Sequence, residues 1–167
     1  MPGRRVFFSF HYEQDVWRAT NVRNSGKVDA TTAAGWSDAS LWEEAKRKGR
    51  REIERLIGAG LRGTSVTAVL IGAETANRPW VNYEIEKSIE RGNGLLGVRI
   101  HRIKDQAGQR SQRGAAPAAL SDGGFHIYDW DRNSFGRWVE WAAVAAGKDC
   151  LGHKKPNCFS CSRHWWS

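Results

Sequence analysis

The sequence lacks the features that identify membrane proteins and common cofactor enzymes. No apolar run approaches the roughly 18 residues of a membrane-spanning helix, and the N-terminus soon becomes too polar for a signal peptide. After the first strand-like segment, residues 11–15 read His-Tyr-Glu-Gln-Asp, without the glycines of a dinucleotide-binding loop, and no P-loop occurs. We therefore expect no membrane association and no stably bound dinucleotide cofactor of the usual kind.

Cysteine is scarce, and the three cysteines all lie near the C-terminus. The body of the chain therefore has no disulfide framework, and a reducing cytoplasm is the expected compartment. The residues of this tail that are candidate zinc ligands are Cys150, His153, Cys158, Cys161 and His164. Any four would suffice for a tetrahedral site, but the first spacing is short and irregular, so the pattern favours a metal-free tail over zinc. We predict a domain over residues 1–147 and a separate Cys/His-containing tail over residues 148–167.

Charge and aromatic content point to anionic or ring-containing partners. The 26 basic and 18 acidic residues give the 167-residue chain a net charge of +8, and nine tryptophans are present. Nucleic acid, phosphorylated nucleotides and acidic proteins are all compatible with this charge. Large aromatic side chains bury much area and also offer stacking surfaces for rings.

Strand-like and helix-like segments alternate along the chain. Strands are predicted over residues 6–10, 65–72, 94–100 and 125–130, with a weak edge strand over 34–37. Helices are predicted over about 15–24, 40–57, 79–91 and 134–146, and a long loop over 104–121. This alternation predicts an α/β, flavodoxin-like three-layer fold with a central, mostly parallel sheet and helices on both faces.

The helix after the buried strand 65–72 carries the strongest candidate site. Trp80 and Glu84 are four residues apart, so they lie on one line of this helix near its start. In open α/β sheets ligands bind at the carboxyl ends of the strands, which is where this helix begins. The alternative is that Trp80 is packing and that Glu84 pairs with Lys87 or Ser88 on a solvated face. We expect Glu84 to be partly exposed, beside the apolar stripe of the helix.

Longer motifs give the chain a family resemblance that covers roughly residues 4–146. The motifs are RVFFSFHY (5–12), DVWR (15–18), VRNS (22–25), GWSDASLWE (35–43) and RPWVNYEI (78–85). Together they strongly resemble the TIR-like subunit of the Thoeris antiphage defence system. The resemblance implies a TIR-like version of the flavodoxin-like fold. Enzymes of this family cleave NAD⁺, release nicotinamide and make a cyclic ADP-ribose isomer that activates a partner effector.

The resemblance also assigns roles to individual residues. The catalytic glutamate of TIR enzymes falls on Glu84, although Val81 stands where the related TIR pattern usually has a cysteine. The predicted substrate-binding residues are Ser9, Phe10, His11, Arg23, Trp36 and Trp80. Trp80 would stack on a ring, and Arg23 or Arg18 would meet the pyrophosphate. Core packing and helix capping are the alternatives for Phe10 and His11, and a helix-surface charge is the alternative for Arg23.

The chemistry of NAD⁺ cleavage agrees with a single catalytic carboxylate. Breaking the bond between ribose and nicotinamide builds oxocarbenium character on the sugar, which a nearby carboxylate stabilises. Nicotinamide is already a cationic leaving group, so a second carboxyl acid is not required.

The leading hypothesis is a cytoplasmic, NAD⁺-consuming signal synthase with no cofactor beyond its substrate. It would act on an effector protein through its small-molecule product and would assemble as a homo-oligomer if its site needs a second copy. The alternatives are a non-catalytic TIR-like assembly module and a nucleic-acid-binding domain. No membrane partner and no specific nucleic acid are expected.

Nucleic acid tests one of these alternatives directly. We expect labelled oligonucleotides of two unrelated sequences to bind weakly and equally, and to dissociate as salt rises, because only the net positive charge attracts them. Fluorescence anisotropy across a salt series measures this. A sequence-specific complex that survives physiological salt would favour the nucleic-acid alternative.

Overall fold

The computed structural model describes residues 3–33 and 39–148. Within these residues the strands form one sheet in the order β2-β1-β3-β4-β5, and all neighbours are parallel. The strands are β1 (Arg5–Ser9), β2 (Asp29–Thr31), β3 (Val66–Ile71), β4 (Gly94–Arg99) and β5 (Ile127–Asp129). The helices are α1 (Tyr12–Arg23), α2 (Ala39–Lys48), α3 (Arg50–Leu61), the 3₁₀ turn η1 (Thr75–Asn77), α4 (Pro79–Glu90), α5 (Ala118–Asp122) and α6 (Phe135–Ala145). This is the flavodoxin strand order, so the predicted α/β, flavodoxin-like fold is confirmed.

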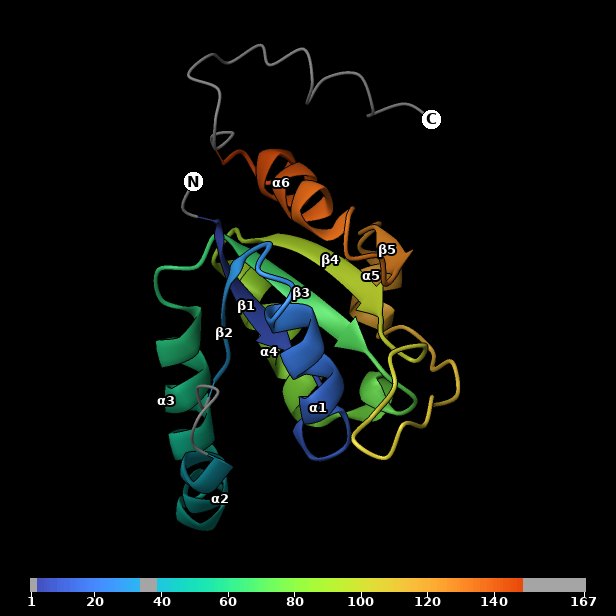
Figure 1. Cartoon of the computed structure of the whole chain (residues 1–167). Coiled ribbons are helices and arrows are strands. Elements are labelled where there is room, and N and C mark those ends of the chain that lie inside the picture. The colour runs from blue at the N-terminus through green and yellow to red at the C-terminus, as the bar shows by residue number, and fades with distance from the viewer. Residues whose placement is uncertain (1–2, 34–38, 149–167) are drawn as a thin grey trace.

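Helices cover both faces of the sheet and make the three predicted layers (Figure 1). On one face, α1 and α6 pack on a cluster that includes Phe8, Leu70 and Phe135. On the other face, α2 and α3 surround Phe7, whereas α4 and α5 pack against Ile71 and its neighbours. Every residue of β3 is buried because the strand is central and covered twice. This explains the continuous apolar run of its sequence.

The helix predicted over 40–57 is two helices. Gly49 separates α2 from α3 with a φ of +106°, a backbone conformation that residues with a Cβ rarely adopt. The prediction was wrong here because the apolar pattern runs through the break without a change of spacing. The second helix runs past the predicted end at residue 57, continues through Gly58 and Gly60, and ends at Leu61, shortly before Gly63 with its φ of +75°.

Other boundaries shift by a few residues. The first helix begins at Tyr12, directly after β1, rather than near residue 15. An edge strand is present at Asp29–Thr31, whereas the predicted edge strand at 34–37 lies outside the described residues. The loop predicted over 104–121 ends in the short helix α5.

Arg18 ties the loop after β4 to helix α1. Its guanidinium, on a side chain that is 6% exposed, pairs with Asp15 at 3.3 Å and with Asp105 at 3.4 Å. It also donates to the backbone oxygens of Ile103 at 2.9 Å and Gln109 at 3.1 Å. Such a buried cation is stable because each of its three nitrogens donates to an oxygen and two carboxylates offset its charge. The loop therefore leaves the sheet edge along a fixed course.

The predicted tail lies outside this description. The candidate zinc ligands and the boundary at 147/148 stay predictions, because residues 149–167 are not among those described. In the part of the chain that is described, no helix is long and apolar enough to cross a membrane.

Candidate active site

A buried hydrogen bond joins the end of β1 to helix α4. Ser9 is the last residue of β1 and is fully buried, and its hydroxyl donates to Glu84 Oε2 at 2.5 Å. Glu84 is 6% exposed. Burial raises the pKa of Glu84 to about 8, and the hydrogen bond from Ser9 opposes this rise only in part. The sheet order brings the two residues together, because β1 lies beside β3 and α4 follows β3.

Glu84 differs from both descriptions that the sequence offered for its environment. It is buried rather than partly exposed, since it shares the inward face of α4 with Val81, Ile85 and Ser88. Its carboxyl does not pair with Lys87, which lies 2.8 Å from Glu90 instead. The Ser88 hydroxyl donates to the backbone oxygen of Glu84 and not to its carboxyl.

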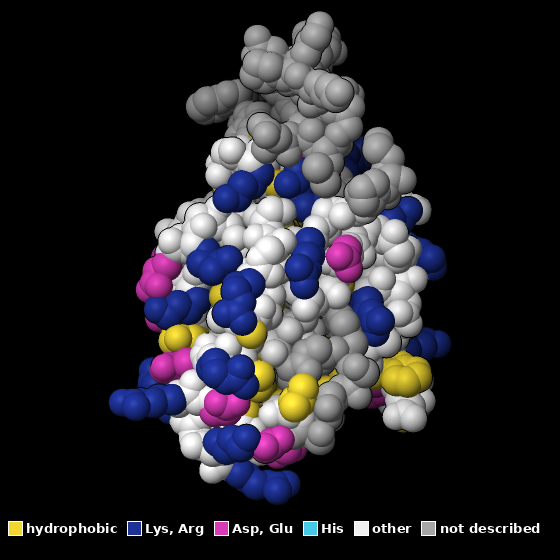
Figure 2. Space-filling model, turned by 90° about the vertical axis from the view of Figure 1, so that its left-hand side faces the viewer, with side chains coloured by type: hydrophobic (Ala, Val, Ile, Leu, Met, Phe, Trp, Pro, Cys, Tyr) yellow, Lys and Arg dark blue, Asp and Glu magenta, His cyan; other side chains and the backbone are white. Residues whose placement is uncertain are grey.

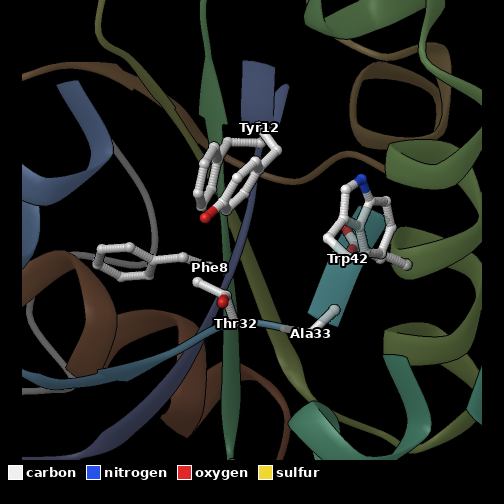
Figure 3. A pocket seen from close by; sticks show the side chains of 7 residues that line it. Phe8, Tyr12, Thr32, Ala33 and Trp42 are labelled. Carbon is white, nitrogen blue, oxygen red and sulfur yellow. The ribbon is translucent and has the colours of Figure 1, made fainter. Parts of the chain in front are cut away.

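Glu84 lines two pockets that share several residues. The inner pocket has a volume of about 280 Å³, including solvent at its mouth, and lies beside the ends of β1 and β2 (Figure 3). Its lining residues are Phe8, Phe10, Tyr12, Thr32, Ala33, Trp42 and Glu84. The outer cleft has a volume of about 580 Å³, including solvent at its mouth, and Glu84 borders it as well. Its other lining residues are Phe10, His11, Tyr12, Glu13, Trp42, Lys46, Arg78, Pro79, Trp80 and Val81. Glu84 therefore lies in the wall that the two pockets share.

Aromatic rings form much of the pocket walls. Phe10 and Tyr12 stack with ring centroids 5.8 Å apart and an interplanar angle of 22°. Trp80 contacts Tyr83 edge to face, and the guanidinium of Arg50 lies 5.8 Å from the centre of the Trp80 ring. Such walls have a low dielectric constant and negative ring faces, which suits a flat cation.

His11 faces the outer cleft with a buried nitrogen. It occupies the N-cap position of α1 but makes no side-chain capping hydrogen bond, so the capping alternative is wrong. The side chain is almost fully buried, and Nδ1 has no hydrogen-bond partner among the described residues. A buried polar atom in this state is a candidate for contact with a ligand.

The cations at the cleft are not those that the sequence suggested. Arg23 lies at the far end of α1, and twelve helical residues span roughly 18 Å, so the structure does not bring it to the cluster. Arg18 is occupied by its contacts to the loop. Lys46 and Arg78 line the outer cleft instead. Only tertiary packing selects them among the many basic residues of the chain.

Lys46 and Arg78, the two cations at the rim of the outer cleft, both already have acidic partners. Lys46 Nζ lies 2.7 Å from Glu13 and 3.1 Å from Glu43, and an Arg78 nitrogen lies 2.7 Å from Glu74. Arg78 Nε is buried without a partner in the described residues. The surface over α2 and α3 likewise mixes basic and acidic side chains (Figure 2). The net charge is therefore not gathered in an uncompensated basic groove on this face.

The remaining predicted residues are placed as follows. Phe10, His11 and Trp80 meet Glu84 at the cleft, and Ser9 contacts Glu84 directly. Trp36 lies outside the described residues. The sequence prediction missed Trp42, although it stands in one of the motifs, and Thr32, which no motif marks. Among described residues no group of three His, Cys, Asp or Glu is arranged to hold a metal ion.

Comparison with known proteins identifies the family of this fold. The sequence model described as "Thoeris protein ThsB, TIR-like domain" matches residues 7–105, a range that contains Ser9, Thr32 and Glu84. A Bacillus cereus (strain MSX-D12) protein named "Putative cyclic ADP-D-ribose synthase ThsB1" is 44% identical over 152 residues. The match covers 86% of this chain and 78% of that protein.

The raised pKa of Glu84 makes the stability of the fold depend on pH. The pKa is about 8 in the folded protein, against 4.5 for an ordinary glutamate. The stability that the protonated form contributes is therefore fully present below pH 4.5 and is lost as the pH rises through about 8. We expect the free energy of unfolding to fall by a few kcal/mol, as an order of magnitude, across this window.

Urea denaturation at a series of pH values measures this change. Glu84→Gln should flatten the pH dependence, because the amide does not titrate and its oxygen can still accept from Ser9. Glu86→Gln is the matched control, since Glu86 is exposed on the same helix. Equal pH slopes for the parent and Glu84→Gln would contradict the raised pKa.

Proposed function

This chain belongs to the Thoeris ThsB family with a TIR-like domain, and we propose that it is an enzyme that consumes NAD⁺. It cleaves the bond between nicotinamide and ribose and joins the ADP-ribose product into a ring. The name of the Bacillus cereus relative, "Putative cyclic ADP-D-ribose synthase ThsB1", supports the formation of such a ring. The observation that carries this proposal is the buried carboxyl of Glu84, held by Ser9 at the junction of two pockets.

The protonation state of the Glu84 carboxyl depends on whether the cationic substrate is bound. In the empty site near neutral pH, a pKa of about 8 keeps most of the carboxyl protonated. The pyridinium of NAD⁺ is a cation, and a cation nearby lowers the pKa of a carboxyl. Substrate binding would therefore release the proton and place a carboxylate beside the sugar when positive charge begins to form there.

The bond from ribose C1′ to the nicotinamide nitrogen then breaks heterolytically. Its electron pair goes to nicotinamide, which leaves as a neutral molecule, and the sugar becomes an oxocarbenium ion beside the Glu84 carboxylate. This is electrostatic stabilisation at a site arranged before the reaction. A nucleophilic group of the same ADP-ribose closes the ring, and when that group is a hydroxyl, Glu84 accepts its proton.

The outer cleft suits the remaining part of the substrate. Lys46 and Arg78 at its rim are placed to meet the diphosphate, and Trp80 offers a ring face. His11, with its buried Nδ1, is proposed to contact the ribose or the diphosphate. The predicted roles of Ser9 and Phe10 become more specific, since Ser9 orients Glu84 and Phe10 forms a wall shared by both pockets.

We also propose that the cyclic product carries the signal to an effector protein and that this chain assembles into a homo-oligomer. The non-catalytic alternative is not favoured, because an assembly module has no need of a buried carboxyl whose desolvation costs stability. The nucleic-acid alternative is not favoured either, because a carboxyl in the wall of both pockets argues against a groove for a phosphate backbone there.

Glu84→Gln tests the catalytic role. The variant keeps the size of the side chain but removes the charge that stabilises the sugar cation, so we expect nicotinamide release to fall by about 10²–10³. The assay follows nicotinamide and cyclic product by chromatography, with phage infection supplied as the trigger. Glu86→Gln should retain the parent rate.

Two results would contradict this proposal in different ways. Parent-like turnover by Glu84→Gln would remove Glu84 from the chemistry. No consumption of NAD⁺ by the parent, with or without infection, would make the non-catalytic assembly module the better description.

A further inference from the structure

Thr32 places a buried and unpartnered hydroxyl in the wall of the inner pocket. It directly follows β2 and is 5% exposed, and its Oγ1 has no hydrogen-bond partner among the described residues. Figure 3 shows Thr32 among the side chains that line this pocket, together with Phe8, Ala33, Tyr12 and Trp42. A buried hydroxyl without a partner costs free energy, so its position is explained if a bound molecule supplies the partner.

The backbone at Thr32 is held by close packing against helix α3. A Cβ added to Gly60 would lie 2.7 Å from the backbone oxygen of Thr32 and 3.0 Å from Ala33 Cα. Only a residue without a side chain allows the helix to approach this closely. The hydroxyl is therefore carried by a segment whose position is fixed before any ligand arrives, as specific recognition requires.

The chemistry of the inner pocket selects one part of the substrate. Its walls are mostly aromatic or aliphatic, and its polar groups include the Thr32 hydroxyl and the Glu84 carboxyl. A sugar or a diphosphate needs many hydrogen-bond partners, whereas a pyridinium ring needs aromatic faces and a nearby anion. The nicotinamide ring then lies inward of Glu84 and the ribose lies outward, which puts the scissile bond at the carboxyl.

We propose that Thr32 is a specificity-determining residue whose hydroxyl forms a hydrogen bond with the carboxamide of nicotinamide in the inner pocket. This inference rests on the proposed function. The carboxamide is the group that distinguishes nicotinamide from a bare pyridine ring, and it both donates and accepts hydrogen bonds. A hydroxyl can therefore pair with it in either direction. Thr32 acts on binding, and Glu84 acts on the bond that breaks.

Free ligands test the contact without any need for turnover. Thr32→Val keeps the shape of the side chain and removes the hydroxyl. We expect nicotinamide to bind this variant about tenfold more weakly, with the affinity for pyridine unchanged, because pyridine has no carboxamide. Ligand titrations followed by NMR give both affinities. Thr31→Val makes the same chemical change one residue earlier, at a side chain that lines neither pocket, and should bind both ligands like the parent.

Kinetics separate a binding role from a structural one. For Thr32→Val we expect KM for NAD⁺ to rise about tenfold with kcat unchanged, since the carboxamide contact is equally strong in the ground state and in the transition state. A loss of kcat, or equal weakening of nicotinamide and pyridine, would mean that the substitution had disturbed the pocket and would overturn the inference.

Failure of this inference differs from failure of the proposed function. If the parent cleaves NAD⁺ and Thr32→Val binds nicotinamide as tightly as the parent does, the hydroxyl meets only solvent and the inference is wrong. If the parent cleaves no NAD⁺, the proposed function fails, whereas the nicotinamide and pyridine titrations still report whether the pocket recognises a carboxamide.

Discussion

The hydrogen bond between Ser9 and Glu84 is the interaction on which the rest of the site depends. Glu84 is only 6% exposed, so its charged form loses most of its hydration. This loss disfavours the carboxylate and raises the pKa of Glu84. The burial is tolerated because the proton neutralises the group and because Ser9 offers it one donor at 2.5 Å. The contact requires β1 and β3 to be neighbours and α4 to follow β3 after the short turn η1. The parallel sheet therefore brings together two residues that are 75 positions apart.

The sequence predicted the architecture well because the buried strands and the amphipathic helices have strong periodic patterns. It predicted the position of Glu84 near the start of α4, but it did not predict its burial. The apolar stripe was traced through Val81, Ile85 and Ile89, but Ile89 is 47% exposed. The buried face is made of Val81, Glu84, Ile85 and Ser88. These four positions follow the spacing of a single helix face. Two polar residues on a core face were the available signal that the fold contains a buried polar site.

What the sequence could not predict depends on packing between distant segments. Gly49 breaks a helix that its apolar pattern would continue, and Gly60 lies inside a helix because the segment at Thr32 packs against it. The choice among basic residues has the same origin. Arg18 is used by the loop after β4, and the cleft receives Arg78 and Lys46 instead. Spacing along the chain contains no information on which of these cations meets which neighbour.

The distribution of charge in the two pockets favours one orientation of the bound substrate. The inner pocket is aromatic and presents a carboxyl that becomes negative when a cation approaches, whereas the outer cleft has cations at its rim. Under the proposed function the substrate has the complementary polarity, with a pyridinium at one end and a diphosphate in its middle. Binding in the reverse sense would place the neutral adenine beside the Glu84 carboxyl and the pyridinium at the far end of the cleft, so the carboxyl would have no cation to pair with. The orientation that brings the scissile bond to Glu84 is therefore also the orientation that the electrostatics favour. The ion pairs from Lys46 to Glu13 and from Arg78 to Glu74 limit the attraction of these cations for any phosphate, so the diphosphate alone does not determine binding. Selectivity then comes from the presence of a cationic end and an anionic middle in the same molecule. Few abundant polyanions combine these two features.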